Sequence, residues 1–402
     1  MPGSRNSHPE ARAPLSGNIF LVITPAKRPW QVLIAARPDA PLVAGLPAAV
    51  RAAVRAGREL SPERIVIAGA DDAFMRRWTF QLRAAGVPTF IGENGAGALD
   101  QRLPLLALDP DSFPDKGGLS DFAAGATAGD ACRTLFGRPV AALRRNPAAF
   151  GAGVADPENV LTQALTAPAS EIPLGAFLDA RGPAAERSAE TLCARLAKDN
   201  DGYIAQFDRR LSIAISRLLL PLPVAPNHVT TLGLGLGLLG AWWLAAPSAR
   251  LQFYGALVLW FCCLLDGCDG EIARLKHLSS PSGARYDVWA DHFSHLATFV
   301  ALPIGVARLH PGQDWLVAGA LLVSGFLASG FSVWYLVLRV PEDQRGPLAL
   351  TVERIASRDY VYLILALTAI GRLDWFVWAA AIGSHLFNAW LWLQARRVLA
   401  VA

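Results

Sequence analysis

The chain is short of charge and of cysteine. Charged residues make up 17% of its 402 residues, whereas a soluble globular protein carries about 25%. Its five cysteines form no CxxC pair, so neither a disulfide framework nor a zinc or thioredoxin-type site is expected. The N-terminal segment MPGSRNSHPEARAPLSGN has no apolar signal core, which predicts that the N-terminal region stays in the cytoplasm. A net charge of +4 gives no reason to expect a nucleic-acid partner.

Apolar residues are plentiful and unevenly distributed. They make up 53% of the chain, and from about residue 230 they form long runs such as WLVAGALLVSGFLASGFSVWYLVL. Most of these runs approach the ~20 residues that a bilayer core requires. The predicted spans are 229–246, 251–273, 287–307, 315–338, 359–371 and 375–394, of which the fifth is short. We therefore predict an all-α bundle of six transmembrane helices over residues 229–402.

The positive charges between these spans predict their orientation. Arg and Lys fall mainly on the side of the N-terminal region, and Arg250, Arg308 and Arg372 are on the other side. The positive-inside rule then places both termini in the cytoplasm. The expected localisation is the cell inner membrane, as a multi-pass protein in contact with the lipid bilayer.

Two further segments precede the bundle. Residues 196–228 carry apolar side chains at helical spacing, which predicts an amphipathic helix in the membrane interface, or one packed on the protein, followed by a proline-rich linker. Residues 1–195 are expected to form a cytoplasmic α/β domain with a mainly parallel sheet, because strand-like and helix-like runs alternate there. The predicted strands are 18–24, 64–69, 87–91 and 103–108, and the predicted helices are 42–59 and 72–85.

Four aspartates lie at the cytoplasmic ends of the second and third predicted spans. Asp266 and Asp269 are three residues apart, and Asp287 and Asp291 are four apart, so each pair projects from one face of its helix. The two helices are joined by a short loop and therefore run antiparallel. Four carboxylates gathered there would repel one another unless cations neutralise them. Oxygen ligands of this kind suit Mg²⁺ or Mn²⁺.

Small residues are interleaved with these aspartates, which together give a recognisable pattern. The run Asp266-x2-Asp269-Gly270-x2-Ala273-Arg274-x8-Gly283-x3-Asp287-x3-Asp291 resembles the signature of the CDP-alcohol phosphotransferase family. The segment Pro226-Asn227-His228-Val229-Thr230 is similar to the PNxxT segment before the first span of that family. The resemblance runs from about Lys198 to the C-terminus.

The resemblance implies a homodimeric membrane enzyme. Such an enzyme moves a phosphoalcohol from a CDP-linked donor to a hydroxyl acceptor and releases CMP. By resemblance, two Mg²⁺ or Mn²⁺ ions would be held by Asp266, Asp269 and Asp287, with Asp291 sharing one ion. Asp291 is also the expected general base for the acceptor hydroxyl.

Further polar residues are candidates for substrate contacts. Gly270, Ala273 and Gly283 would leave room for the cytidine, Arg274 would face the donor phosphate, and Asn227 and Thr230 would line the nucleotide pocket. Arg285, Arg354 and Arg358 are candidates for an acceptor phosphate, although positive-inside anchoring explains them equally well. The span residues His292, His295, His385 and Asn388 are expected to be packed and hydrogen-bonded rather than catalytic.

The order of elements in residues 46–69, helix and then strand, is similar to a sugar-phosphate nucleotidyltransferase domain. Some members of the family carry such a domain upstream, in bifunctional enzymes that make CDP-inositol and then di-inositol phosphate. An active domain needs a Gly-rich phosphate loop after its first strand, and after residues 18–24 this chain reads Pro25-Ala26-Lys27-Arg28-Pro29-Trp30. We therefore expect a catalytically degenerate domain. Asp109 and Asp111 are either remnants of a metal site or ordinary loop residues.

Several alternatives remain open. The donor is either CDP-diacylglycerol, which would make the chain a phospholipid synthase, or a soluble CDP-alcohol of the inositol-phosphate type. The N-terminal domain would make the protein bifunctional if it produced the CDP-alcohol from CTP. A cation-coupled transporter also uses carboxylates within the membrane, but it does not require the Gly, Ala and Arg spacing found here.

Overall fold

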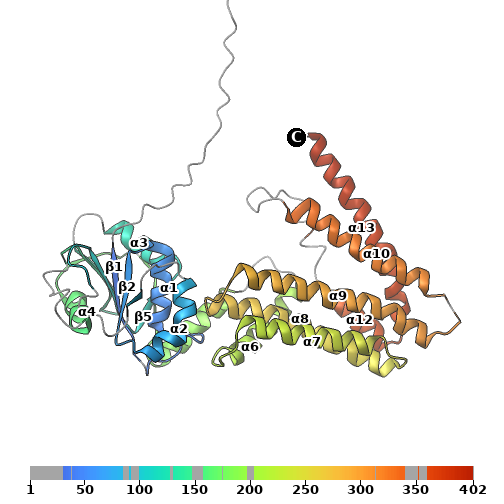
Figure 1. Cartoon of the computed structure of the whole chain (residues 1–402), viewed down its shortest axis with the longest axis horizontal. Helices are drawn as coiled ribbons and strands as arrows, with labels where there is room; N and C mark the ends of the chain where they lie inside the picture. Colours follow the sequence, from blue (N-terminus) through green and yellow to red (C-terminus); the bar gives the residue numbers. More distant parts are fainter. Residues whose placement is uncertain are drawn as a thin grey trace, which may run out of the picture.

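The chain has two regions of different architecture, a sheet region (residues 30–196) and a helical region (residues 203–401) (Figure 1). The structure is a computed structural model. It describes residues 30–37, 39–84, 90–91, 99–126, 130–146, 157–173, 175–196, 203–312, 314–339, 352 and 360–401. An α/β region followed by an α-helical region is the order predicted from the sequence.

The sheet region is built on a seven-stranded sheet of order β3-β2-β1-β4-β7-β6-β8. Its strands are β1 (Gln31–Ala35), β2 (Arg64–Ala68), β3 (Phe90–Ile91), β4 (Leu105–Leu108), β6 (Ala131–Leu135), β7 (Arg138–Arg144) and β8 (Ser170–Glu171). The four strands β3, β2, β1 and β4 are parallel, and β7 is antiparallel to both β4 and β6. A two-stranded sheet, β5 (Ser112–Pro114) with β9 (Phe177–Asp179), is added.

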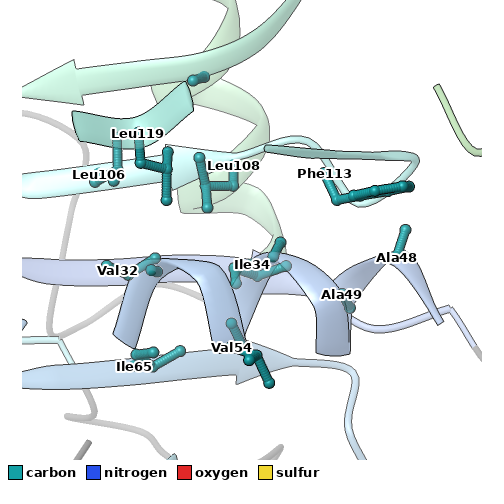
Figure 2. Packing of buried hydrophobic residues seen from close by; sticks show 14 of the residues in the cluster. Val32, Ile34, Ala48, Ala49, Val54, Ile65, Leu106, Leu108, Phe113 and Leu119 are labelled. Atoms are coloured by element: carbon teal, nitrogen blue, oxygen red, sulfur yellow. The ribbon is translucent and has the colours of Figure 1, made fainter. Parts of the chain in front are cut away.

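Helices cover both faces of the large sheet, which explains why its central strands are apolar throughout. One face packs on α1 (Ala48–Leu60), α2 (Asp72–Ala84) and α3 (Gly118–Gly125). Figure 2 shows Val32 and Ile34 of β1 between Ile65 of β2 and the leucines of β4, with Val54 of α1 on the side of Ile65. The other face packs on α4 (Pro157–Thr166), and α5 (Pro183–Ala194) leads toward the helical region.

The predicted elements of this region are largely present. Strands at 64–68 and 105–108 and helices at 48–60 and 72–84 are confirmed, each shorter than predicted by a few residues at one end. The predicted strand at 18–24 and the loop at 25–30 that follows it lie outside the described residues, except for Trp30. The prediction missed β1, an inner strand between β2 and β4, so the loop after the first described strand is residues 36–47 rather than 25–30.

The helical region begins with α6 (Tyr203–Leu219), and further helices of different lengths follow it. These are α7 (Pro226–Leu244), α8 (Ala249–Leu275), α9 (Pro281–Leu309), α10 (Leu316–Val333) continued by the π-helix η2 (Trp334–Leu338), α12 (Tyr360–Ala369) and α13 (Leu373–Val401). Each predicted span thus falls on a helix. Glycines allow α7 and α8 to pack closely, because a Cβ on Gly240 would lie 3.0 Å from the carbonyl oxygen of Gly255.

Among the described residues, three helices are long and apolar enough to cross a membrane. They are Ala249–Leu275, Leu316–Val337 and Leu373–Arg396, and Tyr360–Ala369 is a shorter apolar helix. The chain is therefore a membrane protein. The helices α7 and α9 do not meet the same criteria of length and composition, so a bundle in which six helices cross the bilayer remains a prediction.

The two regions meet at the C-terminal end of α8. Arg51 of α1 is 3% exposed, and its guanidinium donates to the carbonyl oxygens of Val43, Ala44 and Leu275, the last residue of α8. An apolar cluster containing Ala44, Cys193, Leu220 and Leu275 surrounds this contact. Residue 45 must be glycine here, because its φ is +80° and a Cβ would lie 2.5 Å from the carbonyl oxygen of Leu220.

Candidate active site

The four aspartates of the helical region line one cavity between α7, α8 and α9. Asp266 and Asp269 reach it from α8, and Asp287 and Asp291 from α9. The turn 276–280 reverses the chain between these helices, and the Ser280 side chain caps α9 by accepting from the backbone N–H of Gly283. The predicted antiparallel pair therefore brings all four carboxylates to a common space.

Two of these carboxylates have neutral or weakly basic neighbours. The Thr230 hydroxyl of α7 donates to the carboxylate of Asp269, which is 5% exposed. The Nε2 atom of His295 lies 3.5 Å from Oδ1 of Asp291, one helical turn away on α9. Within the described ranges no three His, Cys, Asp or Glu side chains are already arranged as a metal site, so the carboxylates would have to converge on a cation.

A second cavity of about 230 Å³ adjoins the first at Asp269 and Asp287. It is lined by all six residues predicted to contact the donor, which are Asn227, Thr230, Gly270, Ala273, Arg274 and Gly283. The glycines keep it open, because a Cβ on Gly283 would lie 3.3 Å from Oδ1 of Asn227 and one on Gly270 would lie 3.2 Å from Nη1 of Arg274.

A third cavity of about 650 Å³ lies mainly between α8 and α6, and it shares Asp266, Asp269 and Asp287 with the first cavity. Three arginines line it, Arg195 at the end of α5, Arg209 of α6 and Arg274 of α8. Arg195 forms an ion pair with Asp115, which raises the pKa of the Arg195 guanidinium. The sheet region thus contributes a wall to a space that Asp266 also lines.

A fourth cavity extends from Asp291 into the apolar part of the helical region. It has a volume of about 660 Å³ and lies between α9, α10, α12 and α13. Aromatic and aliphatic side chains such as Phe299, Phe326 and Phe387 line most of it. Such a lining suits an apolar group of a substrate.

Some residues predicted from the sequence are absent from the lining of these cavities, and two lie outside the described residues. Arg285 is exposed on α9, and Arg354 and Arg358 are outside the described residues. His385 contacts the carbonyl oxygen of Leu321 at 3.1 Å, and Asn388 donates to Ser329 Oγ. Asn388 is half-buried and hydrogen-bonded, as predicted, whereas His385 is hydrogen-bonded but exposed rather than packed.

Sequence reasoning missed Glu271, which follows Asp269 by two residues on α8. This carboxylate is 1% exposed and accepts from the hydroxyls of Ser212 and Ser216 on α6 at 2.6 and 2.7 Å. It fixes α6 against α8, which forms a wall of the third cavity. The available signal was a third carboxylate in the same span, together with two serines at i and i+4 in the preceding amphipathic segment.

Asp109 and Asp111, the candidate remnants of a metal site in the sheet region, are ion-paired with arginines. Arg181 lies 2.8 Å from Asp109, and Arg37 lies 2.8 Å from Asp111. Burial raises the pKa of Asp109 in spite of Arg181. Arg37 and Asp109 follow β1 and β4, between which the strand order reverses, and ligands bind at such a point in open α/β sheets. Here arginine side chains occupy it.

The helical region is similar to known proteins. The model of the CDP-alcohol phosphatidyltransferase family matches residues 223–393. The bifunctional IPC transferase and DIPP synthase of Rubrobacter xylanophilus is 40% identical over 140 residues, which cover 34% of this chain and 31% of that protein. The phosphatidylinositol phosphate synthase of Mycobacterium tuberculosis is 38% identical over 93 residues, 23% of this chain and 42% of that protein.

The chain thus spans less than half the length of these relatives. Among solved structures, the crystal structure of Mycobacterium tuberculosis phosphatidylinositol phosphate synthase with CDP-DAG bound is 24% identical, with a TM-score of 0.32. That match covers 46% of this chain and 94% of the mycobacterial chain.

Proposed function

We propose that this chain is a membrane phosphotransferase, because residues 223–393 match the model of the CDP-alcohol phosphatidyltransferase family. It moves a phosphoalcohol group from a CDP-linked donor to a hydroxyl acceptor and releases CMP. The observation that carries this proposal is that Asp266, Asp269, Asp287 and Asp291 line one cavity, directly beside the cavity lined by the six candidate donor residues.

The carboxylates that line the first cavity are suitable ligands for hard divalent cations. Carboxylate oxygens from two facing helices are the ligands that Mg²⁺ and Mn²⁺ prefer, and four negative charges in one cavity call for positive charge. We assign Asp266, Asp269 and Asp287 as ligands, with Asp291 sharing one ion. Two bound ions would neutralise the pyrophosphate of the donor.

Asp291 acts as the general base in this proposal. The acceptor oxygen attacks the phosphorus that carries the alcohol, a P–O bond to the acceptor forms, and the P–O bond to CMP breaks. The hydroxyl proton passes to the carboxylate of Asp291. This residue suits the role because it lines both the carboxylate cavity and the apolar cavity, where two substrates can meet.

The second cavity holds the nucleotide end of the donor. Gly270, Ala273 and Gly283 let the cytidine approach the helix backbones, and Arg274 faces the donor phosphates. Asn227 and Thr230 complete the wall from α7. The apolar cavity beyond Asp291 supports a lipid-linked substrate, and we propose that the donor is a CDP-diacylglycerol rather than a soluble CDP-alcohol.

The third cavity offers positive charge to the acceptor. Arg195, Arg209 and Arg274 would attract an anionic acceptor such as a polyol phosphate. Arg285, Arg354 and Arg358 remain candidates for the same contact. We also propose that six helices cross the cell inner membrane and that both termini lie in the cytoplasm. We propose that the protein is a homodimer.

We propose a degenerate nucleotidyltransferase-like domain over residues 1–195, joined to residues 229–402 by an interfacial helix and linker at 196–228. Two features of the structure support degeneracy. Arginines pair with Asp109 and Asp111, and residues 43–45, in the loop after β1, pack on the helical region instead of leaving a phosphate cradle. The role of this domain in the proposal is to support the C-terminal end of α8.

The test is CMP release by the purified full chain in lipid nanodiscs. CDP-diacylglycerol and soluble CDP-alcohols are offered as donors, with free and phosphorylated polyols as acceptors. We expect CMP only with a CDP-linked donor and a hydroxyl acceptor. The absence of CMP with every pair, together with cation flux in liposomes, would favour a transporter.

The same preparation tests the sheet region. Incubation with CTP and a sugar phosphate should release no pyrophosphate, because the loop after β1 provides no phosphate cradle. Pyrophosphate release by the full chain, lost on deletion of residues 30–196, would make the protein bifunctional.

A further inference from the structure

A chain of three side chains connects Asp291 to α12. His295 follows Asp291 by one turn of α9, and its Nε2 lies 3.5 Å from Asp291 Oδ1. On the other side of the ring, Nδ1 of His295 is hydrogen-bonded to the hydroxyl of Tyr360, the first residue of α12. The side chain of His295 is 16% exposed and that of Asp291 is 28% exposed.

The direction of these contacts follows from their chemistry. A neutral histidine donates from one ring nitrogen and accepts at the other. An ionised carboxylate only accepts, so the ring nitrogen that faces Asp291, Nε2, must carry the proton. Nδ1 is then the acceptor, and the Tyr360 hydroxyl donates to it. Tyr360 therefore selects the tautomer of His295 that can donate to Asp291.

The surroundings hold this chain in place. The ring of Tyr360 meets that of His295 edge-on at 5.8 Å and also contacts Phe299 at 5.6 Å. Asp291, His295 and Tyr360 all line the apolar cavity, together with Phe299 and Phe376. In such surroundings a polar contact is stronger than in water, so the 3.5 Å contact with His295 favours one orientation of the Asp291 carboxylate.

We infer that His295, oriented by Tyr360, is a positioning residue for Asp291. The inference rests on the proposed function, because it concerns the residue assigned as general base. In this inference the contact of His295 with Oδ1 favours one orientation of the Asp291 carboxylate, the one in which the second oxygen takes the proton of the acceptor hydroxyl. A general base needs a defined orientation, since misplacement of a catalytic group lowers turnover without weakening substrate binding.

The kinetic test compares variants that keep or remove the N–H group that residue 295 presents to Asp291. His295→Leu removes it and should lower kcat about 10–100-fold, with the KM for the CDP-linked donor within twofold, as expected for an outer partner of a site. His295→Gln keeps an N–H group near the Nε2 position and should recover most of the loss. Tyr360→Phe should lower kcat in the wild-type background and have no further effect in His295→Leu, because both act through one contact.

The control is His385→Leu. His385 is also a membrane-region histidine, but it bonds to the Leu321 carbonyl oxygen, so its loss should leave kcat unchanged. A His295→Leu variant of normal thermal stability and normal kcat would overturn the inference. So would equal effects of His295→Leu and His295→Gln, or full additivity with Tyr360→Phe.

A second measurement does not depend on turnover. The ¹⁵N shifts of a selectively labelled histidine ring report its tautomer in the full chain without substrate. We expect the Nε2–H tautomer for His295 and a change of tautomer population in Tyr360→Phe. Observation of the Nδ1–H tautomer in the wild type would overturn the inference even if the protein transfers phosphate. If CMP release fails but the Nε2–H tautomer is found, the proposed function fails and the contact chain stands.

Discussion

Both regions of the molecule contain carboxylates near the end of buried elements, but these carboxylates have different partners. In the sheet region, Asp109 and Asp111 are paired with Arg181 and Arg37 at 2.8 Å. In the helical region, Asp269 accepts from the Thr230 hydroxyl, and Asp291 faces His295. The helical carboxylates also line a small cavity that is joined at Asp269 and Asp287 to a larger one of about 230 Å³. The difference teaches that similar carboxylates can be neutralised by arginines in one region and face a hydroxyl and a histidine in the other.

The largest effect should come from removing divalent cations. A chelator should abolish CMP release, and Mg²⁺ or Mn²⁺ should restore it, because four clustered carboxylates need positive charge to bind a pyrophosphate. Calorimetric titration of the apo protein should show the same binding in Asp109→Asn as in the wild type. CMP release that persists in chelator would remove the contrast between the regions.

The next largest effect should come from the same substitution made in each region. Asp291→Asn should lower kcat about 10²–10⁴-fold, since an amide cannot take the proton of the acceptor hydroxyl. Asp111→Asn should leave kcat unchanged, because Asp111 contacts only arginines of the sheet region in the interactions described above. Near-normal turnover of Asp291→Asn in steady-state CMP release would show that the base is another group.

A third comparison uses two buried arginines. Arg51 bonds to carbonyl oxygens of both regions, whereas Arg144, which is fully buried, bonds to those of Ala164, Ala167 and Pro168 within the sheet region. Either residue replaced by Met should lower the free energy of unfolding by about 3 kcal/mol, because buried carbonyls lose their donor.

Only Arg51→Met should also lower turnover, because it releases the end of the helix that carries Asp266 and Asp269. Thermal unfolding and CMP release, measured on both variants, separate the two effects. Equal turnover in the two variants would show that the sheet region does not support the site.

The smallest effect concerns pH at the contact between the regions. Burial, with help from Arg51, Arg58 and Arg55, lowers the pKa of His277 from 6.5 to about 2. Below pH 6.5 the unfolded chain takes up a proton there and the folded chain does not. The free energy of unfolding therefore decreases as the pH is lowered, by about 1.4 kcal/mol at pH 5.5. His277→Gln should flatten this dependence between pH 7.5 and 5.5 in thermal unfolding, and an unchanged slope would contradict the assignment.

The sequence was most informative where the signal is local. The strands at 64–68 and 105–108 are short apolar runs between helical patterns, and the four aspartates sit at fixed helical spacing. The strand β1 was missed because the stronger run at 18–24 drew the first strand to an earlier position. Most of the elements between residues 115 and 190 were not predicted, because alanine-rich strands such as β7 have little periodicity.

Contacts between distant residues were beyond such reasoning. Tyr360 meets His295 across 65 positions of the chain, and Arg51 meets Leu275 across 224. Each side chain by itself has ordinary surroundings in sequence, an aromatic at a helix start and a basic residue in an alanine-rich helix. Only the packing of α12 on α9, and of α1 on α8, gives them a role.

The bond between Glu271 and the serines of α6 has a consequence for biogenesis. A carboxylate near the membrane is costly until it finds hydrogen-bond donors. Ser212 and Ser216 precede Glu271 by 59 and 55 residues, and the ribosome makes the chain from its N-terminus. The donors are therefore already synthesised when α8 enters the bilayer, so α6 can receive the acidic end of that helix during translation.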